Sequence, residues 1–148
     1  MKHVFLKYKL QLVKETSVKY ECDNKITSPD NIKNICYNVY GLNNECEEVL
    51  LLLALDIKLK VIGIFEVSRG SLDTLTTHPR EIFKRLLLCN AHSFILAYNH
   101  PSGDARPSND DINICEKIHD CAVTMRINLI DFCIIGDEFY SFKEHKIL

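Results

Sequence analysis

Short apolar runs, each bounded by polar or turn-forming residues, are the main pattern along this chain. Runs of this length that are rich in β-branched and aromatic residues predict strands. They cover residues 49–55, 61–67, 93–98, 127–135 and 138–142. The first two flank a polar turn and the last two flank Gly136-Asp137, so each pair predicts an antiparallel hairpin. Because the first two runs are almost continuously apolar, we expect both strands to be covered on both faces.

Three stretches with helical spacing of apolar residues lie between these runs. The first begins at Ser28-Pro29, where serine suits the N-cap and proline the first turn, and it ends before Gly41. The second begins at Thr77-His78-Pro79 and ends near Asn90, and the third covers about residues 108–123. Strand pairs interrupted by helices predict an α/β or α+β fold with a mixed β-sheet flanked by helices.

The N-terminal residues have a different pattern from the rest. Apolar residues alternate with others over residues 4–12, which predicts a strand or an extended arm, and residues 14–27 are mostly polar. A length of 148 residues fits one domain with its own core. We therefore expect an N-terminal strand or arm at 1–26 and a single domain at 27–148.

Composition narrows the classes of function. The net charge of −2 gives no electrostatic basis for direct nucleic-acid binding. The longest apolar run, 49–55, is far shorter than the ~20 residues of a membrane span, and the N-terminus is charged too early for a signal peptide. The seven cysteines, without C-x-x-C spacing, lie mostly in apolar surroundings, which indicates buried free thiols in a reducing cytoplasm.

The segment ILAYNHPSGDARPSNDD, residues 95–111, carries the candidate chemistry. Alternation along a strand places Tyr98 and His100 on one face, and Asp111 follows in the first turn of the next helix. Imidazole and carboxylate are zinc ligands, and zinc-bound water becomes a nucleophile near neutral pH. A separate carboxylate would move the proton. Ser108 and Asp111 also have the spacing of a helix capping box, which is compatible with a ligand role for Asp111.

The stretch NHPSGDARPSNDD resembles the metal loop of RadC-like JAB/MPN (JAMM) metalloprotease domains, whose signature is H-x-H-P-x(n)-S-x-x-D. Four more segments resemble successive parts of RadC domains: SPDNIKNI, EVLLLLALDIKLKVIG, GSLDTLTTHPREIFKRLLL and LIDFCIIGDEFYSF. The resemblance covers about residues 27–143. It implies a cytidine-deaminase-like JAB/MPN sandwich, a family with a DNA-repair label, and hydrolysis of a peptide or isopeptide bond by zinc-bound water.

The resemblance also implies residue roles. His100 matches the second histidine ligand and Asp111 the acidic ligand. Ser108 matches the motif serine, which in the family polarises the scissile carbonyl or holds the tetrahedral oxyanion. The general acid/base is a glutamate on an earlier strand, for which Glu48 fits best and Glu66 is the second choice.

Tyr98 departs from the family pattern, which has histidine at this position. Four outcomes are open. Tyr98 ligates as a phenolate despite a reference pKa near 10; His92 or His78 replaces it; two ligands and waters hold zinc weakly; or metal binding is lost. A second departure is Asp131-Phe132, where family members commonly have aspartate and histidine.

Two classes of function follow. One is a zinc-dependent metallopeptidase or isopeptidase-type hydrolase, weakened by the loss of one ligand. The other is a catalytically inactive MPN domain that serves as an interaction or dimerisation module, with a homodimer as one assembly. Without the resemblance, Tyr98 is explained as a half-buried strand residue, His100 as a turn residue and Glu48 as a solvated charge at a strand end.

Overall fold

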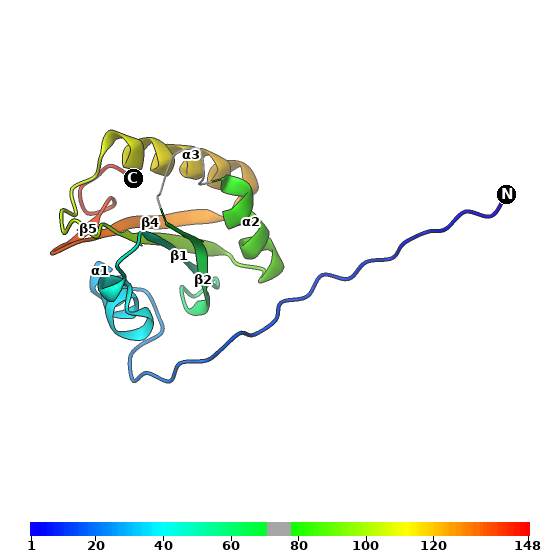
Figure 1. The fold of residues 1–148 in the computed structure, drawn as a ribbon, viewed down its shortest axis with the longest axis horizontal. Helices are drawn as coiled ribbons and strands as arrows, with labels where there is room; N and C mark the ends of the chain where they lie inside the picture. Colours follow the sequence, from blue (N-terminus) through cyan, green and yellow to red (C-terminus); the bar gives the residue numbers. More distant parts are fainter. Residues whose placement is uncertain (71–77) are drawn as a thin grey trace.

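The computed structural model describes residues 1–70 and 78–148. One five-stranded sheet lies at its centre, with helices on both faces (Figure 1). The elements are α1 (Pro29–Asn34), η1 (Ile35–Tyr40, a π-helix), η2 (Leu42–Asn44, a 3₁₀ turn), β1 (Val49–Leu55), β2 (Val61–Arg69), α2 (Pro79–Leu88), β3 (Ser93–Asn99), α3 (Asn109–Met125), β4 (Asn128–Ile135) and β5 (Phe139–Ser141). This confirms the predicted α+β class.

The strands follow the order β2-β1-β3-β4-β5 across the sheet. β1 is antiparallel to β2 and β3, β3 is parallel to β4, and β4 is antiparallel to β5. Both predicted hairpins are therefore confirmed. The parallel pair requires a crossover connection, which α3 provides.

Two hydrophobic cores lie on opposite faces of the sheet, because the side chains of β1 and β3 alternate between them. Leu52, Leu96 and other inward residues pack against α2 and α3 on one face. Leu51 and Ala97 pack against α1 and η1 on the other. All residues of β1 and β3 are buried, so both central strands are covered on both faces.

The expectation that β2 is covered on both faces is wrong. None of its residues is buried, and Ile62 and Glu66 are exposed. β2 is the outer strand of the sheet and pairs along its length only with β1. Its apolar composition fits an edge strand as well as a central one, so hydrophobicity alone did not give its place in the sheet.

The predicted helix boundaries are confirmed where they are described. Ser28 forms a capping box at the start of α1, with Pro29 in the first turn. Gly41 ends η1 in the left-handed conformation, with φ of 84°, which glycine adopts without steric strain. At α2, His78 is the N-cap and Asn90 follows the helix end, whereas Thr77 lies outside the described residues.

Residues 1–20 form an extended, fully exposed arm that leaves the domain and contains no helix or strand (Figure 1). The chain joins the sheet only near Lys25, which forms an isolated antiparallel bridge with Lys60. Residues 4–12 are thus part of this extended segment and form no strand within the described part of this single chain.

The seven cysteines are all free. Cys36, Cys115 and Cys133 are buried, as expected, whereas Cys46 is exposed and the other three are intermediate. Among the described residues, no helix has the length and apolar character needed to cross a membrane.

The loop after β3 is held tightly against the β4–β5 turn. The Asp137 N–H donates to the Gly103 carbonyl at 2.7 Å, and the His100 N–H donates to the Ile135 carbonyl at 2.7 Å. A Cβ on Gly136 would lie 2.2 Å from the Gly103 carbonyl oxygen, a distance that backbone atoms cannot accept. Gly136 is therefore required for the close approach of loop and turn.

We expect Gly136→Ala to lower the free energy of unfolding by about 1–3 kcal/mol, because the new methyl group forces the two backbone segments apart. Chemical denaturation measures this value. Ser102→Ala, an exposed change in the same loop, serves as the control and should leave stability within about 0.5 kcal/mol. Equal stability of the two variants would contradict the close contact.

Candidate active site

The predicted site residues gather where β3 ends and α3 begins. Tyr98 points into the core on the α3 side of the sheet, and His100 follows two positions later. Asp111 lies in the first turn of α3 and is buried. The His100 Nε2 and Asp111 Oδ2 atoms are 3.5 Å apart. The structure therefore brings together the residues that the resemblance assigns to the metal site.

The capping box of α3 holds Asp111 in place. The Ser108 N–H donates to Asp111 Oδ2 at 2.7 Å, and the Asp111 N–H donates to the Ser108 hydroxyl oxygen at 3.1 Å. The predicted cap is confirmed. One carboxylate thus caps the helix and faces His100 at the same time, near the positive end of the helix dipole.

The ring of His100 is oriented by the loop that follows it. Its Nδ1 lies 2.6 Å from the Asp104 carbonyl oxygen, which can only accept, so Nδ1 carries a proton. This leaves Nε2 directed at Asp111. A metal-binding histidine has the same arrangement, with one ring nitrogen on a carbonyl and the other on the ligand side.

The electrostatics of the pair favour its charged form. Burial opposes ionisation of Asp111, but the contacts with His100 and Ser108, together with the nearby Tyr98 hydroxyl, outweigh it and lower the pKa of Asp111 to about 2. The hydrogen bond with Asp111 raises the pKa of His100 above its usual range against the opposing effect of burial. Imidazolium and carboxylate therefore stabilise each other.

Tyr98, at the position where the resemblance implies a histidine ligand, is a core residue. Its residue exposure is 2%, and its hydroxyl oxygen is fully buried. Burial, followed by the nearby Asp111 carboxylate, raises the pKa of Tyr98 far above its usual range, so the group is a neutral phenol. The hydroxyl is close enough to Asp111 for this effect, but it makes no hydrogen bond of good geometry with the described residues.

Tyr98 and Phe132, the two residues at which the resemblance implies histidines, contact each other. The Tyr98 ring lies 5.5 Å from that of Phe132 and 5.1 Å from that of His100, measured between centroids. Phe132 in turn packs edge-on against Phe142 at 5.0 Å. Tyr98 and Phe132 thus form one aromatic cluster beside His100.

Glu48 and Glu66, the two candidates for the general acid/base, lie on opposite faces of the sheet. Glu48 precedes β1, and continuation of the Leu50–Tyr98 pairing places it opposite His100. Its charge contributes to the raised pKa of His100, after the larger effect of Asp111. Glu66 pairs across the strands with Leu51, which belongs to the other face.

Glu66 is instead part of an ion network on that other face. The Tyr40 hydroxyl donates to it at 2.6 Å, and Arg69 donates to it at 2.8 Å. Arg69 also pairs with Glu45 at 2.7 Å. These contacts give Glu66 a structural role. Of the two glutamates, Glu48 is the one on the same face of the sheet as His100.

Asn99 positions the segment that carries Glu48, a role that the sequence analysis did not predict. Its side-chain oxygen accepts from the Val49 N–H at 2.7 Å. Its amide nitrogen donates to the carbonyls of Glu47 at 2.8 Å and Glu45 at 3.2 Å. The signal available in the sequence was a polar residue inside an otherwise apolar strand, since buried amides occur where they are hydrogen-bonded.

The side chains present do not fit a three-ligand zinc site. His100 Nε2 and Asp111 Oδ2, at 3.5 Å, are spaced like two ligands of one zinc ion, which lie about 3.4 Å apart in tetrahedral geometry. The third position holds the neutral phenol of Tyr98. Within residues 1–70 and 78–148, no group of three His, Cys, Asp or Glu side chains is arranged to hold a metal ion.

Neither histidine suggested as a replacement completes the set. His92 precedes β3, at the opposite end of the strand from His100, and its N–H donates to the Leu55 carbonyl. Eight residues of extended chain separate the two histidines by about 25 Å. His78 caps α2 and is exposed.

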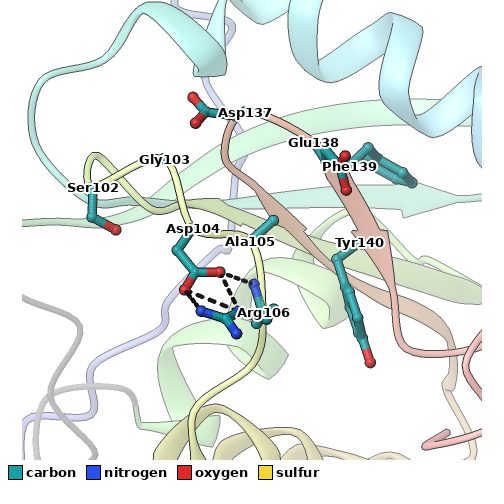
Figure 2. A pocket seen from close by; sticks show the side chains of 9 residues that line it. All are labelled: Ser102, Gly103, Asp104, Ala105, Arg106, Asp137, Glu138, Phe139 and Tyr140. Carbon is teal, nitrogen blue, oxygen red and sulfur yellow. Dashed lines mark hydrogen bonds and ion pairs between the residues drawn. The ribbon is translucent and has the colours of Figure 1, made fainter.

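Two clefts open beside the site. One, of about 440 Å³, is lined by Cys46, Glu47, Glu48, Gly70, Pro101 and Ser102. The other, also about 440 Å³, lies between the loop after His100 and the β4–β5 hairpin (Figure 2). There Asp104 and Arg106 pair with each other at 2.6 Å, and Asp137 and Glu138 belong to the hairpin side. Both clefts expose acidic side chains.

Comparison with known proteins places this arrangement in a family. The family described as "RadC-like JAB domain" matches residues 26–147. A UPF0758 protein of Clostridium beijerinckii is 44% identical over 128 residues, which cover 85% of this chain and 55% of the relative. A UPF0758 protein of Clostridium perfringens is 40% identical over 139 residues, 93% of this chain and 60% of the relative. The chain thus spans little more than half the length of these relatives.

We expect Asn99→Ala to lower the free energy of unfolding by about 2–4 kcal/mol, because one buried and two partly buried backbone groups lose their partner. Thermal or chemical denaturation measures the loss. Asn128→Ala, an exposed asparagine at the start of β4, is the matched control and should change stability by less than about 0.5 kcal/mol. Similar values for both variants would show that the Asn99 contacts contribute little.

Stability should depend on pH through Asp111 and His100. The pKa of Asp111 is lowered to about 2 from a usual value near 4, so its contribution is present above pH ~4 and is lost as the pH falls towards 2. The pKa of His100 is raised, so its contribution is present below pH ~6.5 and is lost as the pH rises through the folded-state value. Denaturation of Asp111→Asn across this range should show a flatter profile at both ends, and an unchanged profile would contradict the pairing.

Proposed function

The chain belongs to the RadC-like JAB domain family, and on that premise we propose that it is a catalytically inactive member that serves as an interaction module. The observation that carries the proposal is Tyr98. At a position where the family's zinc chemistry requires a ligand, this chain has a buried, neutral phenol packed in an aromatic cluster. Neutral phenols are poor ligands, since binding as phenolate requires loss of a proton that the surroundings of Tyr98 oppose.

The contacts of the remaining site residues support this proposal. Asp111 is held by the Ser108 N–H and faces His100, and this contact raises the pKa of His100. His100, Ser108 and Asp111 therefore have stabilising roles that require no metal, and Glu48 stays beside them as an acidic surface group next to a cleft.

A zinc-dependent hydrolase of the peptidase or isopeptidase type, weakened by one missing ligand, is the second candidate. It is favoured by the 3.5 Å spacing of His100 Nε2 and Asp111 Oδ2 and by the Nδ1 contact with Asp104, both of which suit a zinc site. Zinc would supply an activated water if it were bound. In that case His100 and Asp111 would hold it, and Glu48 would accept and return the proton.

Zinc affinity distinguishes the two candidates. We expect the natural chain, purified without chelator, to bind zinc weakly or not at all, and Tyr98→His to raise the affinity at least about tenfold, equivalent to about 1.4 kcal/mol, because it adds a third ligand. Competition with a chromogenic zinc chelator measures the dissociation constant directly and needs no substrate.

Two further variants serve as controls. Tyr8→His makes the same change on the exposed arm and should not raise the affinity, whereas His100→Ala in the Tyr98→His background should remove the gain. Tight zinc binding by the natural chain, unaffected by Tyr98→His, would overturn the inactive assignment and favour the hydrolase.

A further inference from the structure

The N-terminal arm has many large apolar side chains that are exposed to solvent in the single chain. Ten of the seventeen exposed large hydrophobic side chains in the described part of the chain lie in residues 1–20. Val4, Leu6, Tyr8, Leu10 and Leu12 occupy alternate positions, and Phe5, Lys7, Lys9 and Gln11 stand between them. This is the pattern of a strand with one apolar and one mostly polar face. A patch of this kind indicates an interaction site.

The arm also carries charge opposite to that of the rest of the chain. Residues 1–20 contain five lysines and one glutamate, whereas the remaining residues contain thirteen lysines and arginines against nineteen acidic residues. The arm therefore has a net positive charge, and the rest of the chain has a net negative charge. A second copy of this chain offers the complementary charge.

The edge of β2 is a surface on which such a strand can add. β2 is nine residues long and pairs along its length only with β1, so beyond Val61 its outer backbone groups have no strand partner among the described residues. Neither Pro nor Lys is present in β2 to block pairing, and Ile62 on it is 45% exposed. The opposite edge, β5, has only three residues.

Within the described part of one chain, the end of the arm forms two hydrogen bonds at the start of this edge and no further ones. The Ile26 N–H donates to the Leu59 carbonyl, and the Val61 N–H donates to the Asn24 carbonyl, after which the arm leaves the sheet (Figure 1). If this antiparallel ladder continued upstream, β2 would be used up near residue 16. The apolar stretch 4–13 therefore lies beyond the reach of its own β2 edge.

The length of the arm suits a second copy. Twenty extended residues span about 65 Å, whereas a domain of this size is roughly 35 Å across. The arm thus reaches well beyond its own domain. The match to the C. perfringens relative covers 93% of this chain and so extends into the arm, although the family match begins at residue 26.

We propose that two copies of this chain exchange their arms, with residues 4–13 of each adding as a strand to the β2 edge of the other. Main-chain hydrogen bonds along β2 supply affinity, and the alternate apolar side chains of the arm supply specificity. Such an interface is isologous, as a two-fold dimer requires. This dimer rests on the proposed interaction role and gives it a partner. The arm and the β2 edge are separate from Tyr98, so the zinc experiment and the following experiment can fail independently.

Light scattering after size-exclusion chromatography tests the proposal on the 148-residue chain. We expect a dimer for the natural chain and a monomer for a variant lacking residues 1–13. Leu6→Ser/Leu10→Ser should weaken dimerisation at least tenfold. The matched control Lys7→Arg/Lys9→Arg makes the same number of changes between the apolar positions, keeps the basic charge and should remain dimeric.

Hydrogen exchange at residues 61–69 identifies the surface. These amides should be protected in the natural chain and lose protection in the deletion variant. A dimer that survives deletion of residues 1–13 would overturn the proposal. A monomeric natural chain would also overturn it, and protection of residues 61–69 in that monomer would show that the arm pairs with its own β2.

Discussion

The complete burial of β1 and β3 is the constraint on which the rest of the molecule depends. A strand buried on both faces has a fixed register, because a shift by one residue would exchange the side chains of the two cores. This fixes Tyr98 towards α3 and Asn99 towards η1 and the segment before β1. The position of every site residue follows from that alternation and from the start of α3.

The charge of Asp111 shows how the site remains stable with an aromatic residue in a ligand position. Its carboxylate caps α3, pairs with His100 and lies at the positive end of the helix dipole. A buried carboxylate that depended on a metal alone would be left uncompensated without it, at a cost of several kcal/mol. Here the Ser108 N–H, His100 and the helix dipole stabilise the charge.

Much of this arrangement could be predicted from the sequence, because local rules determine it. Alternation placed Tyr98 and His100 on one face, and the capping box fixed the start of α3. The face of Glu66 could not be predicted, since two bulges in β2 shift its alternation relative to β1. The exposure of β2 and the contacts of Asn99 depend on strand order, which joins residues about fifty positions apart.

The three hydrogen bonds of Asn99 have a consequence for how this region can vary. They join the end of β3 to the backbone of Glu45, Glu47 and Val49 and use no other side chain. The identities of the side chains in that segment are therefore free to change, whereas its length is not. One inserted or deleted residue between Glu45 and Val49 would shift the carbonyls away from the amide and turn Glu48 away from His100. We therefore expect related chains to differ in the side chains of the segment between Glu45 and Val49 but to keep the number of residues in that segment.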